Sequence, residues 1–105
     1  MTTLIIARHA KSDWGSPALD DHDRPLNDRG LRDAPVMADR LVATGVRVDA
    51  IVSSTALRAR TTAAFYAARL GLELELDENL YGAPARTLLA TGAARGVGSV
   101  MLVAH

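Results

Sequence analysis

The order in which short apolar runs alternate with helical segments is the feature that most constrains the fold of this chain. Runs rich in apolar residues cover residues 4–7, 48–53 and 99–104, without the strict apolar–polar alternation of a half-exposed strand. They are typical of strands that are buried on both faces of a sheet. Residues 72–76 alternate Leu and Glu instead, which predicts a short strand with one solvated face at a sheet edge.

The segment after Asn27 has apolar residues at helical spacing and predicts the first helix. Asn27 is a suitable N-cap, and Gly45 is a suitable stop signal. Pro35 lies inside the pattern, and its ring should clash with the carbonyl group of Leu31, so we expect a kink or a break there. The apolar face of this helix is expected to comprise Leu31, Ala34, Met37, Ala38 and Leu41.

Two more helices are predicted, over residues 56–70 and 84–95. Residues 53–55 (Ser-Ser-Thr) form a turn that can cap the first of them, and Pro84 suits the first turn of the second. Strands and helices therefore alternate along the chain. This alternation predicts an α/β fold, a three-layer α/β/α sandwich with a mostly parallel sheet.

Composition narrows the possible function classes. The chain has 105 residues, enough for one domain over residues 1–105, and its 12 basic and 12 acidic residues cancel. No overall charge attracts nucleic acid or an anionic membrane, so selectivity for an anion must be local. The absence of cysteine excludes disulfides, thiolate nucleophiles and Cys-ligated zinc. The apolar start lacks a basic n-region and no run approaches transmembrane length, so we expect a cytoplasmic protein.

Polar residues follow three of the predicted strands. Arg8 and His9 follow the first, Ser53 and a turn leading to Arg58 end the second, and His105 follows the last. The carboxyl ends of parallel strands meet at one edge of a sheet, which is where α/β proteins bind their ligands. Arginine cannot ligate a metal and repels cations, whereas guanidinium and imidazole groups suit a phosphoryl group. Each residue alone is an ordinary surface group; together they predict an oxyanion site without a metal.

Four sequence blocks resemble the histidine phosphatase superfamily, whose fold is that of phosphoglycerate mutase. Nearly the whole chain takes part in the resemblance. The first two blocks are similar to the SixA-like phosphohistidine phosphatase branch. The blocks are Arg8-His9-Ala10-Lys11-Ser12-Asp13-Trp14, Asp23-Arg24-Pro25-Leu26 with Gly30, Ser54-Thr55-Ala56-Leu57-Arg58-Ala59-Arg60-Thr61, and Val103-Ala104-His105.

The resemblance implies a role for each matching residue. His9 matches the nucleophile that becomes transiently phosphorylated, and Arg8 and Arg58 match the residues that hold the phosphoryl oxygens. His105 matches a second histidine that also binds this group, and Arg24 matches a basic residue close to the phosphate. Nearby guanidinium groups should keep the imidazole of His9 neutral and leave a lone pair for attack. No cofactor and no metal are implied.

Further expectations concern other positions in and near these blocks. Many relatives use a carboxylate near the end of the third strand as general acid, for which Glu78 and Asp77 are the candidates. Thr55 stands where the family often has proline, which should loosen that turn. His22 lies in an acidic loop and is expected to be solvated, and Asp23 is expected to orient Arg24.

The favoured function is a phosphatase that removes phosphate from phosphohistidine of a signalling protein. A phosphatase of small phosphate esters and a phosphate-binding or scaffolding module without turnover are the alternatives, and inorganic phosphate or sulfate can occupy the site in each case. Relatives continue past the second histidine with a further helix and strand, which this chain lacks. We therefore expect a longer parent protein, weak or no turnover by these 105 residues, and self-association through uncovered apolar surface.

Overall fold

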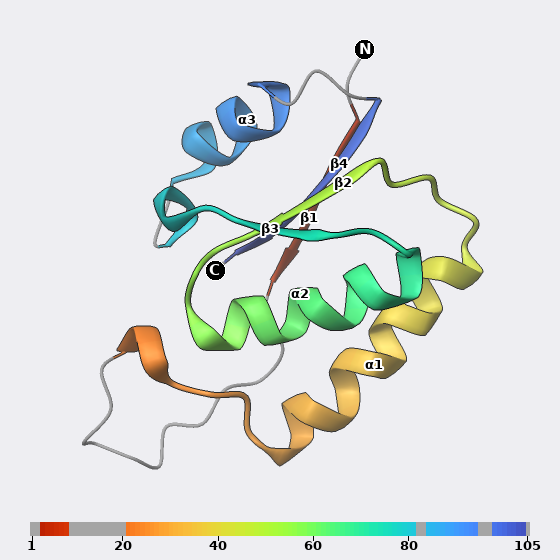
Figure 1. The fold of residues 1–105 in the computed structure, drawn as a ribbon, viewed down its shortest axis with the longest axis vertical. Coiled ribbons are helices and arrows are strands. Elements are labelled where there is room, and N and C mark those ends of the chain that lie inside the picture. The colour runs from red at the N-terminus through yellow and green to blue at the C-terminus, as the bar shows by residue number, and fades with distance from the viewer. Residues whose placement is uncertain (1–2, 9–20, 82–83, 95–97, 105) are drawn as a thin grey trace.

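Four parallel strands form the centre of the structure (Figure 1). The structure is a computed structural model that describes residues 3–8, 21–81, 84–94 and 98–104. The sheet has the order β1-β4-β2-β3, so the expected parallel sheet is confirmed. The strands are β1 (Thr3–Arg8), β2 (Ala50–Ser53), β3 (Leu74–Leu76) and β4 (Ser99–Ala104).

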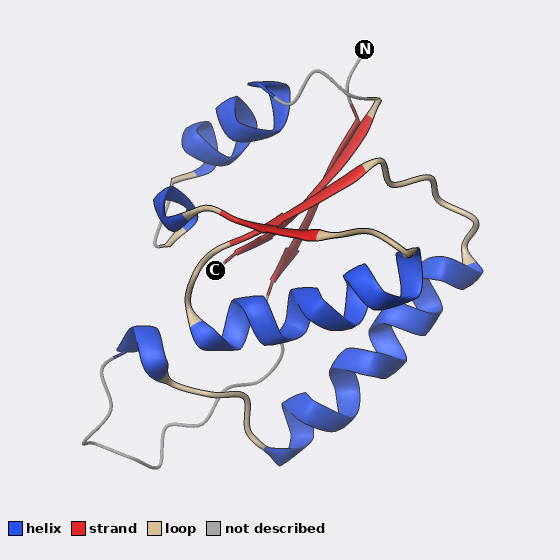
Figure 2. Ribbon diagram, in the orientation of Figure 1, coloured by secondary structure: helices blue, strands red, loops and turns tan. Residues whose placement is uncertain are grey.

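Helices cover both faces of the sheet, as Figure 2 shows. Helices α1 (Asp28–Ala43) and α2 (Leu57–Leu70) pack together on one face, and α3 (Ala85–Ala94) lies on the other. Two short 3₁₀ turns, η1 (Asp21–Asp23) and η2 (Glu78–Leu80), lie in the connections after β1 and β3. The predicted three-layer α/β/α arrangement is therefore confirmed. None of the described helices is long and apolar enough to cross a membrane.

The central strand β4 divides the core in two. Met101 and Val103 face the side of α1 and α2, where the alanines of α2 and Tyr66 bury them. Val100 and Leu102 face the opposite side, where they pack with Leu80 and with Leu88 of α3. Because both faces of β4 are covered, its residues after Ser99 are all apolar, which is why the sequence shows a continuous run rather than an alternation.

The start and end of α1 follow the sequence signals. Asn27 Oδ1 accepts a hydrogen bond from the backbone N–H of Gly30 at 2.8 Å, as predicted for the N-cap. At the other end, Gly45 has a positive φ of 75°, a conformation that costs glycine little.

Of the kink or break predicted at Pro35, the break is wrong, because α1 continues through Pro35 as one helix. Ala34 and Ala38, on either side of the proline, are both buried, and this tertiary packing holds the helix together. The predicted apolar face is also too wide. Leu31 and Met37 are each 47% exposed, so Ala34, Ala38 and the partly buried Leu41 make up the packed part of this face.

Apolar surface remains uncovered beside the edge strand β1. Ile6 is 52% exposed, and a cavity of about 440 Å³ with a mainly apolar lining lies between β1 and α1. Met37 and Leu41 of α1 line it together with Ile5 and Ala7 of β1. The expectation of uncovered apolar surface is therefore met in the part of the chain that the structure describes.

Candidate active site

The strand register brings the carboxyl ends of the four strands to one edge of the sheet. Arg8, the last residue of β1, is the register partner of Ala104 at the end of β4. Ser53, the last residue of β2, is the partner both of Val103 and of Leu76 at the end of β3. This edge is where an open α/β sheet binds its ligand.

The two histidines of the predicted site follow these strand ends in the sequence. His9 comes directly after Arg8, and His105 comes directly after Ala104. Both histidines lie outside the described residues. Arg8 itself is exposed at the end of β1. The structure thus brings together the backbone positions that precede the two histidines.

A tight turn leads from β2 into α2. The N–H of Ser54 donates to the carbonyl of Val103 at 2.9 Å, which extends the pairing with β4 by one residue. Ser53 Oγ donates to the Ser54 carbonyl at 2.8 Å, and Ser54 Oγ accepts from the N–H of Ala56 at 3.3 Å. The predicted capping of α2 by a hydroxyl is wrong, since its N-cap is Ala56, without a side-chain hydrogen bond. The serine hydroxyls hold the turn instead.

Arg58 lies in the first turn of α2 and is only 5% exposed. Thr62 Oγ1 donates to the Arg58 carbonyl at 2.8 Å, one turn further along the helix. The first turn contains no acidic residue, although a helix start normally favours negative charge and disfavours arginine. A buried guanidinium beside the positive end of a helix dipole makes this position attractive to an anion.

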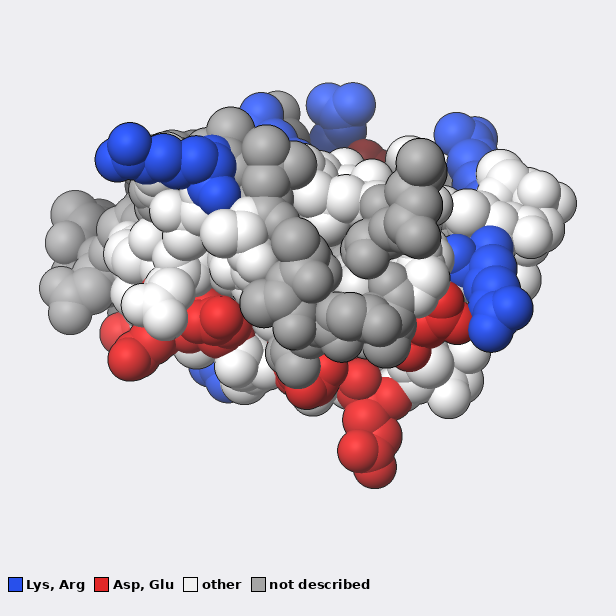
Figure 3. Space-filling view, turned by 90° about the horizontal axis from the view of Figure 1, so that it is seen from above, with Lys and Arg blue, Asp and Glu red and all other residues white. Residues whose placement is uncertain are grey.

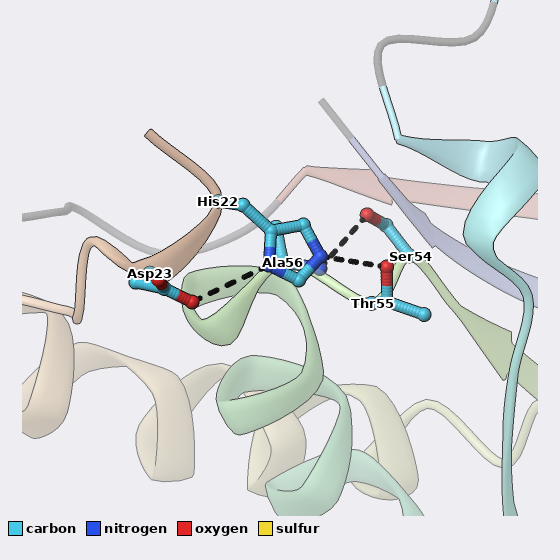
Figure 4. Close-up of polar contacts among 5 residues, drawn as sticks. All are labelled: His22, Asp23, Ser54, Thr55 and Ala56. Atoms are coloured by element: carbon cyan, nitrogen blue, oxygen red, sulfur yellow. Dashed lines mark hydrogen bonds and ion pairs between the residues drawn. The ribbon is translucent and has the colours of Figure 1, made fainter. Parts of the chain in front are cut away.

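The segment that carries Arg24 lies at the same edge of the sheet, in the connection after β1. Arg24 follows η1 directly and is 7% exposed. The side chain of His22 ties this segment to the turn after β2, because His22 Nε2 lies 2.8 Å from Thr55 Oγ1 (Figure 4). The segments that carry Arg24 and Arg58 are therefore joined directly.

The prediction that His22 is solvated holds only in part. Its side chain is 42% exposed, but its Nε2 also contacts Thr55, a contact that spans 33 positions of the sequence. No local pattern signals such a contact. The one available hint was the position of His22 two residues before Arg24, in a block that already pointed to the site.

The two candidate general acids follow the carboxyl end of β3, the outer strand on the side of the sheet opposite to β1. Asp77 follows β3, and its backbone N–H donates to the carbonyl of Ser53 at 2.9 Å. Its side chain accepts from the N–H of Asn79 at 2.9 Å and so caps η2. Glu78 is exposed in the first turn of η2. Of the two carboxylates, Glu78 is the one not engaged as a cap.

The electrostatic character of the described surface is mixed. Figure 3 views the molecule from the side where β1 and β4 begin, away from the candidate site, and shows acidic and basic side chains there in separate groups. Among the described residues, no group of three or more His, Asp or Glu side chains is placed to hold a metal ion. At the carboxyl edge of the sheet, Arg24 and Arg58 place positive charge in buried positions, and Arg8 adds an exposed positive charge at the end of β1.

Comparison with known proteins places the chain in a family. The profile of the histidine phosphatase superfamily (branch 1) matches residues 4–82. A Mycobacterium tuberculosis protein, named only as uncharacterized, is 42% identical over 82 residues, which are 78% of this chain and 50% of that protein. An uncharacterized chloroplastic protein of Arabidopsis thaliana is 46% identical over 59 residues, 56% of this chain and 27% of that protein. The chain thus spans half or less of the length of these relatives.

Solved structures agree with this placement. The "putative phosphohistidine phosphatase SixA" of Agrobacterium tumefaciens superposes with a TM-score of 0.91 and 38% identity, over 99% of this chain and 68% of that chain. A protein histidine phosphatase SixA in complex with tungstate has a TM-score of 0.81 and 25% identity, over 97% of this chain and 68% of that one. On the profile match and these similarities, the chain belongs to branch 1 of the histidine phosphatase superfamily.

Proposed function

We propose that this chain is the phosphoryl-binding part of a phosphatase that needs no metal ion and forms a phosphohistidine intermediate on His9. The observation that carries the proposal is the burial of Arg24 and Arg58 on two segments that meet beyond the carboxyl ends of the strands. Guanidinium groups stay charged at physiological pH and bind phosphoryl oxygens in a bidentate geometry. Two of them at one strand edge form a cradle for a dianion.

The proposed reaction has two steps. A ring nitrogen of His9 attacks phosphorus, a P–N bond to His9 forms, and the bond to the leaving group breaks. Water then attacks the phosphorus of the intermediate, releases inorganic phosphate and regenerates the imidazole. Arg8, Arg24, Arg58 and His105 balance the charge on the equatorial oxygens in both steps. Glu78 is the proposed proton donor to the leaving group.

Phosphohistidine on a signalling protein is the proposed substrate. The support comes from three similar solved structures that are described as putative phosphohistidine phosphatase SixA or as protein histidine phosphatase SixA. The leaving group would then be an imidazole nitrogen. It is protonated more readily than the bridging oxygen of a phosphate ester. Cytoplasmic localisation fits such a substrate and is part of the proposal.

Trapping the intermediate tests the proposal. The protein is mixed with a phosphohistidine-containing protein labelled on phosphorus and quenched in denaturant at alkaline pH, where phosphohistidine survives. We expect label on the wild-type chain and none on His9→Ala. A single labelling event suffices, so the experiment works even where turnover is slow.

A pair of arginine variants tests the cradle. Arg58→Ala should slow phosphoryl transfer by about 10² to 10³-fold, the usual loss when one oxyanion ligand is removed. Arg60→Ala, which removes the same charge from an exposed position on the same helix turn, should change the rate less than about threefold. Equal rates for the two variants would contradict the role of Arg58. Phosphate binding without any trapped label would instead identify a binding module without turnover.

A further inference from the structure

The ring of His22 connects three segments that are far apart in the sequence. It lies in η1, after β1, and its Nε2 is 2.8 Å from Thr55 Oγ1 in the turn after β2. The edge of the ring meets the ring of Tyr81, after β3, with centroids 5.2 Å apart and planes at 70°. These are the connections that follow three of the four strands, at the edge where the candidate site lies.

The neighbouring carboxylate favours one tautomer of the ring. His22 Nδ1 lies 3.5 Å from Asp23 Oδ1, a long contact in which a carboxylate can only accept. The proton of neutral His22 is therefore favoured on Nδ1. Nε2 then accepts the hydroxyl proton of Thr55. Figure 4 shows the ring between Asp23 on one side and the turn with Thr55 on the other.

The two partners of this hydrogen bond stand close in sequence to the two buried arginines. Arg24 follows His22 by two residues, and Arg58 follows Thr55 by three. Arg24 comes directly after η1, and Arg58 lies in the first turn of α2, so about one turn of chain separates each arginine from its neighbour in this hydrogen bond. A change in the distance between His22 and Thr55 would therefore change the distance between the arginines.

We infer that His22 is a positioning residue that sets the spacing of Arg24 and Arg58 through its hydrogen bond to Thr55. The inference rests on the proposed function, because it assumes that these arginines hold a phosphoryl group. His22 does not itself contact the phosphoryl group in this arrangement, since its Nε2 is engaged by Thr55. Reaction rates are sensitive to such spacing, and an error of about 1 Å can cost roughly 10²-fold.

The test separates the hydrogen bond from the ring. His22→Phe keeps an aromatic ring against Tyr81 and loses the bond, and Thr55→Val keeps the shape of the side chain and loses the hydroxyl. Each should weaken the binding of inorganic phosphate and lower kcat/KM by about tenfold. The double variant should be no worse than either single variant, because both remove the same bond.

Conservative variants distinguish positioning from a general loss of stability. Thr55→Ser retains the hydroxyl, and His22→Gln retains a polar atom near the place of Nε2. Both should recover most of the phosphate affinity, whereas His22→Phe should not, even where its melting temperature equals that of the wild type. Additive effects in the double variant, or full phosphate affinity in folded His22→Phe, would overturn the inference.

The same binding measurement keeps this inference separate from the proposed function. Arg58→Ala serves as the reference variant, with phosphate affinity measured by calorimetry. If Arg58→Ala loses phosphate binding and folded His22→Phe does not, the positioning role is refuted and the cradle stands. If neither variant changes the affinity, the cradle itself is refuted, and the role of His22 falls with it.

Discussion

Replacing Pro35 with alanine should stabilise the protein by about 2 kcal/mol. Proline has no N–H, so within α1 the carbonyl of Leu31 cannot make its helical hydrogen bond to residue 35. In a helix interior alanine is more favourable than proline by about 3 kcal/mol. The half-buried ring gives up two carbons on replacement, which costs about 1 kcal/mol at roughly half the value of a fully buried methylene each. The difference should raise the melting temperature by roughly 8–16 °C.

Pro84 provides the matched control. It precedes α3, where its carbonyl accepts from the N–H groups of Thr87 and Leu88 at 3.0 and 3.3 Å and its missing N–H has no helical partner to lose. Pro84→Ala should therefore leave stability unchanged or lower it by about 0.4–1 kcal/mol, because alanine makes the unfolded chain more flexible.

The assay is thermal and urea unfolding of both variants, followed by far-UV circular dichroism. A Pro35→Ala protein that melts at or below the wild-type temperature would refute the reasoning. It would mean that a hydrogen bond from an N–H at position 35 to the Leu31 carbonyl does not stabilise α1. The order of the two variants in stability is as informative as the magnitude of each change. Pro84→Ala more stable than Pro35→Ala would show that the helix boundaries differ from those described.

Three further predictions concern stability. Asn27→Ala should lower the free energy of unfolding, measured in urea, by about 1 kcal/mol because the α1 cap is lost. Asn27→Asp should retain most of the stabilisation that the cap provides. Leu102→Ala, in a fully buried position of β4, should cost about 2–5 kcal/mol, against less than about 1 kcal/mol for Leu31→Ala on the exposed side of α1. Burial raises the pKa of Tyr66 above its ordinary value of 10.0. Above pH 10 the unfolded chain therefore loses this proton more readily than the folded one, and stability falls as pH rises toward the folded-state pKa. Tyr66→Phe should show a smaller fall in melting temperature between neutral and strongly alkaline pH.

The strands could be predicted from the sequence because each carries its signal locally. Residues 100–104 are all apolar, and β4 has the predicted bounds, Ser99–Ala104. The expected edge strand at residues 72–76 is also confirmed at the edge, although β3 covers only Leu74–Leu76. When alternate side chains of an edge strand are solvated, apolar and polar residues alternate in the sequence, and this alternation can be read locally.

Features that depend on distant packing could not be predicted. Pro35 is a local signal against a helix, and only the burial of Ala34 and Ala38 against other elements overrides it. The capping of α2 was predicted from the hydroxyls of residues 53–55, but Thr55 instead faces His22, 33 positions earlier in the chain. At the candidate site, the strand-end positions follow from the alternation of elements. The roles of His9, His105 and Glu78 stay predictions.

The place of β4 in the sheet has a consequence for how the chain can fold during synthesis. β4 comes after the other three strands in the sequence, yet it lies between β1 and β2, and its Ser99 pairs with Thr3. While a ribosome still holds residues 99–104, β1 has no described strand to pair with, and only β2 and β3 can form a ladder. Among the described strands, β1 can therefore pair only after residues 99–104 have emerged, and its closure onto β4 is a late, long-range event.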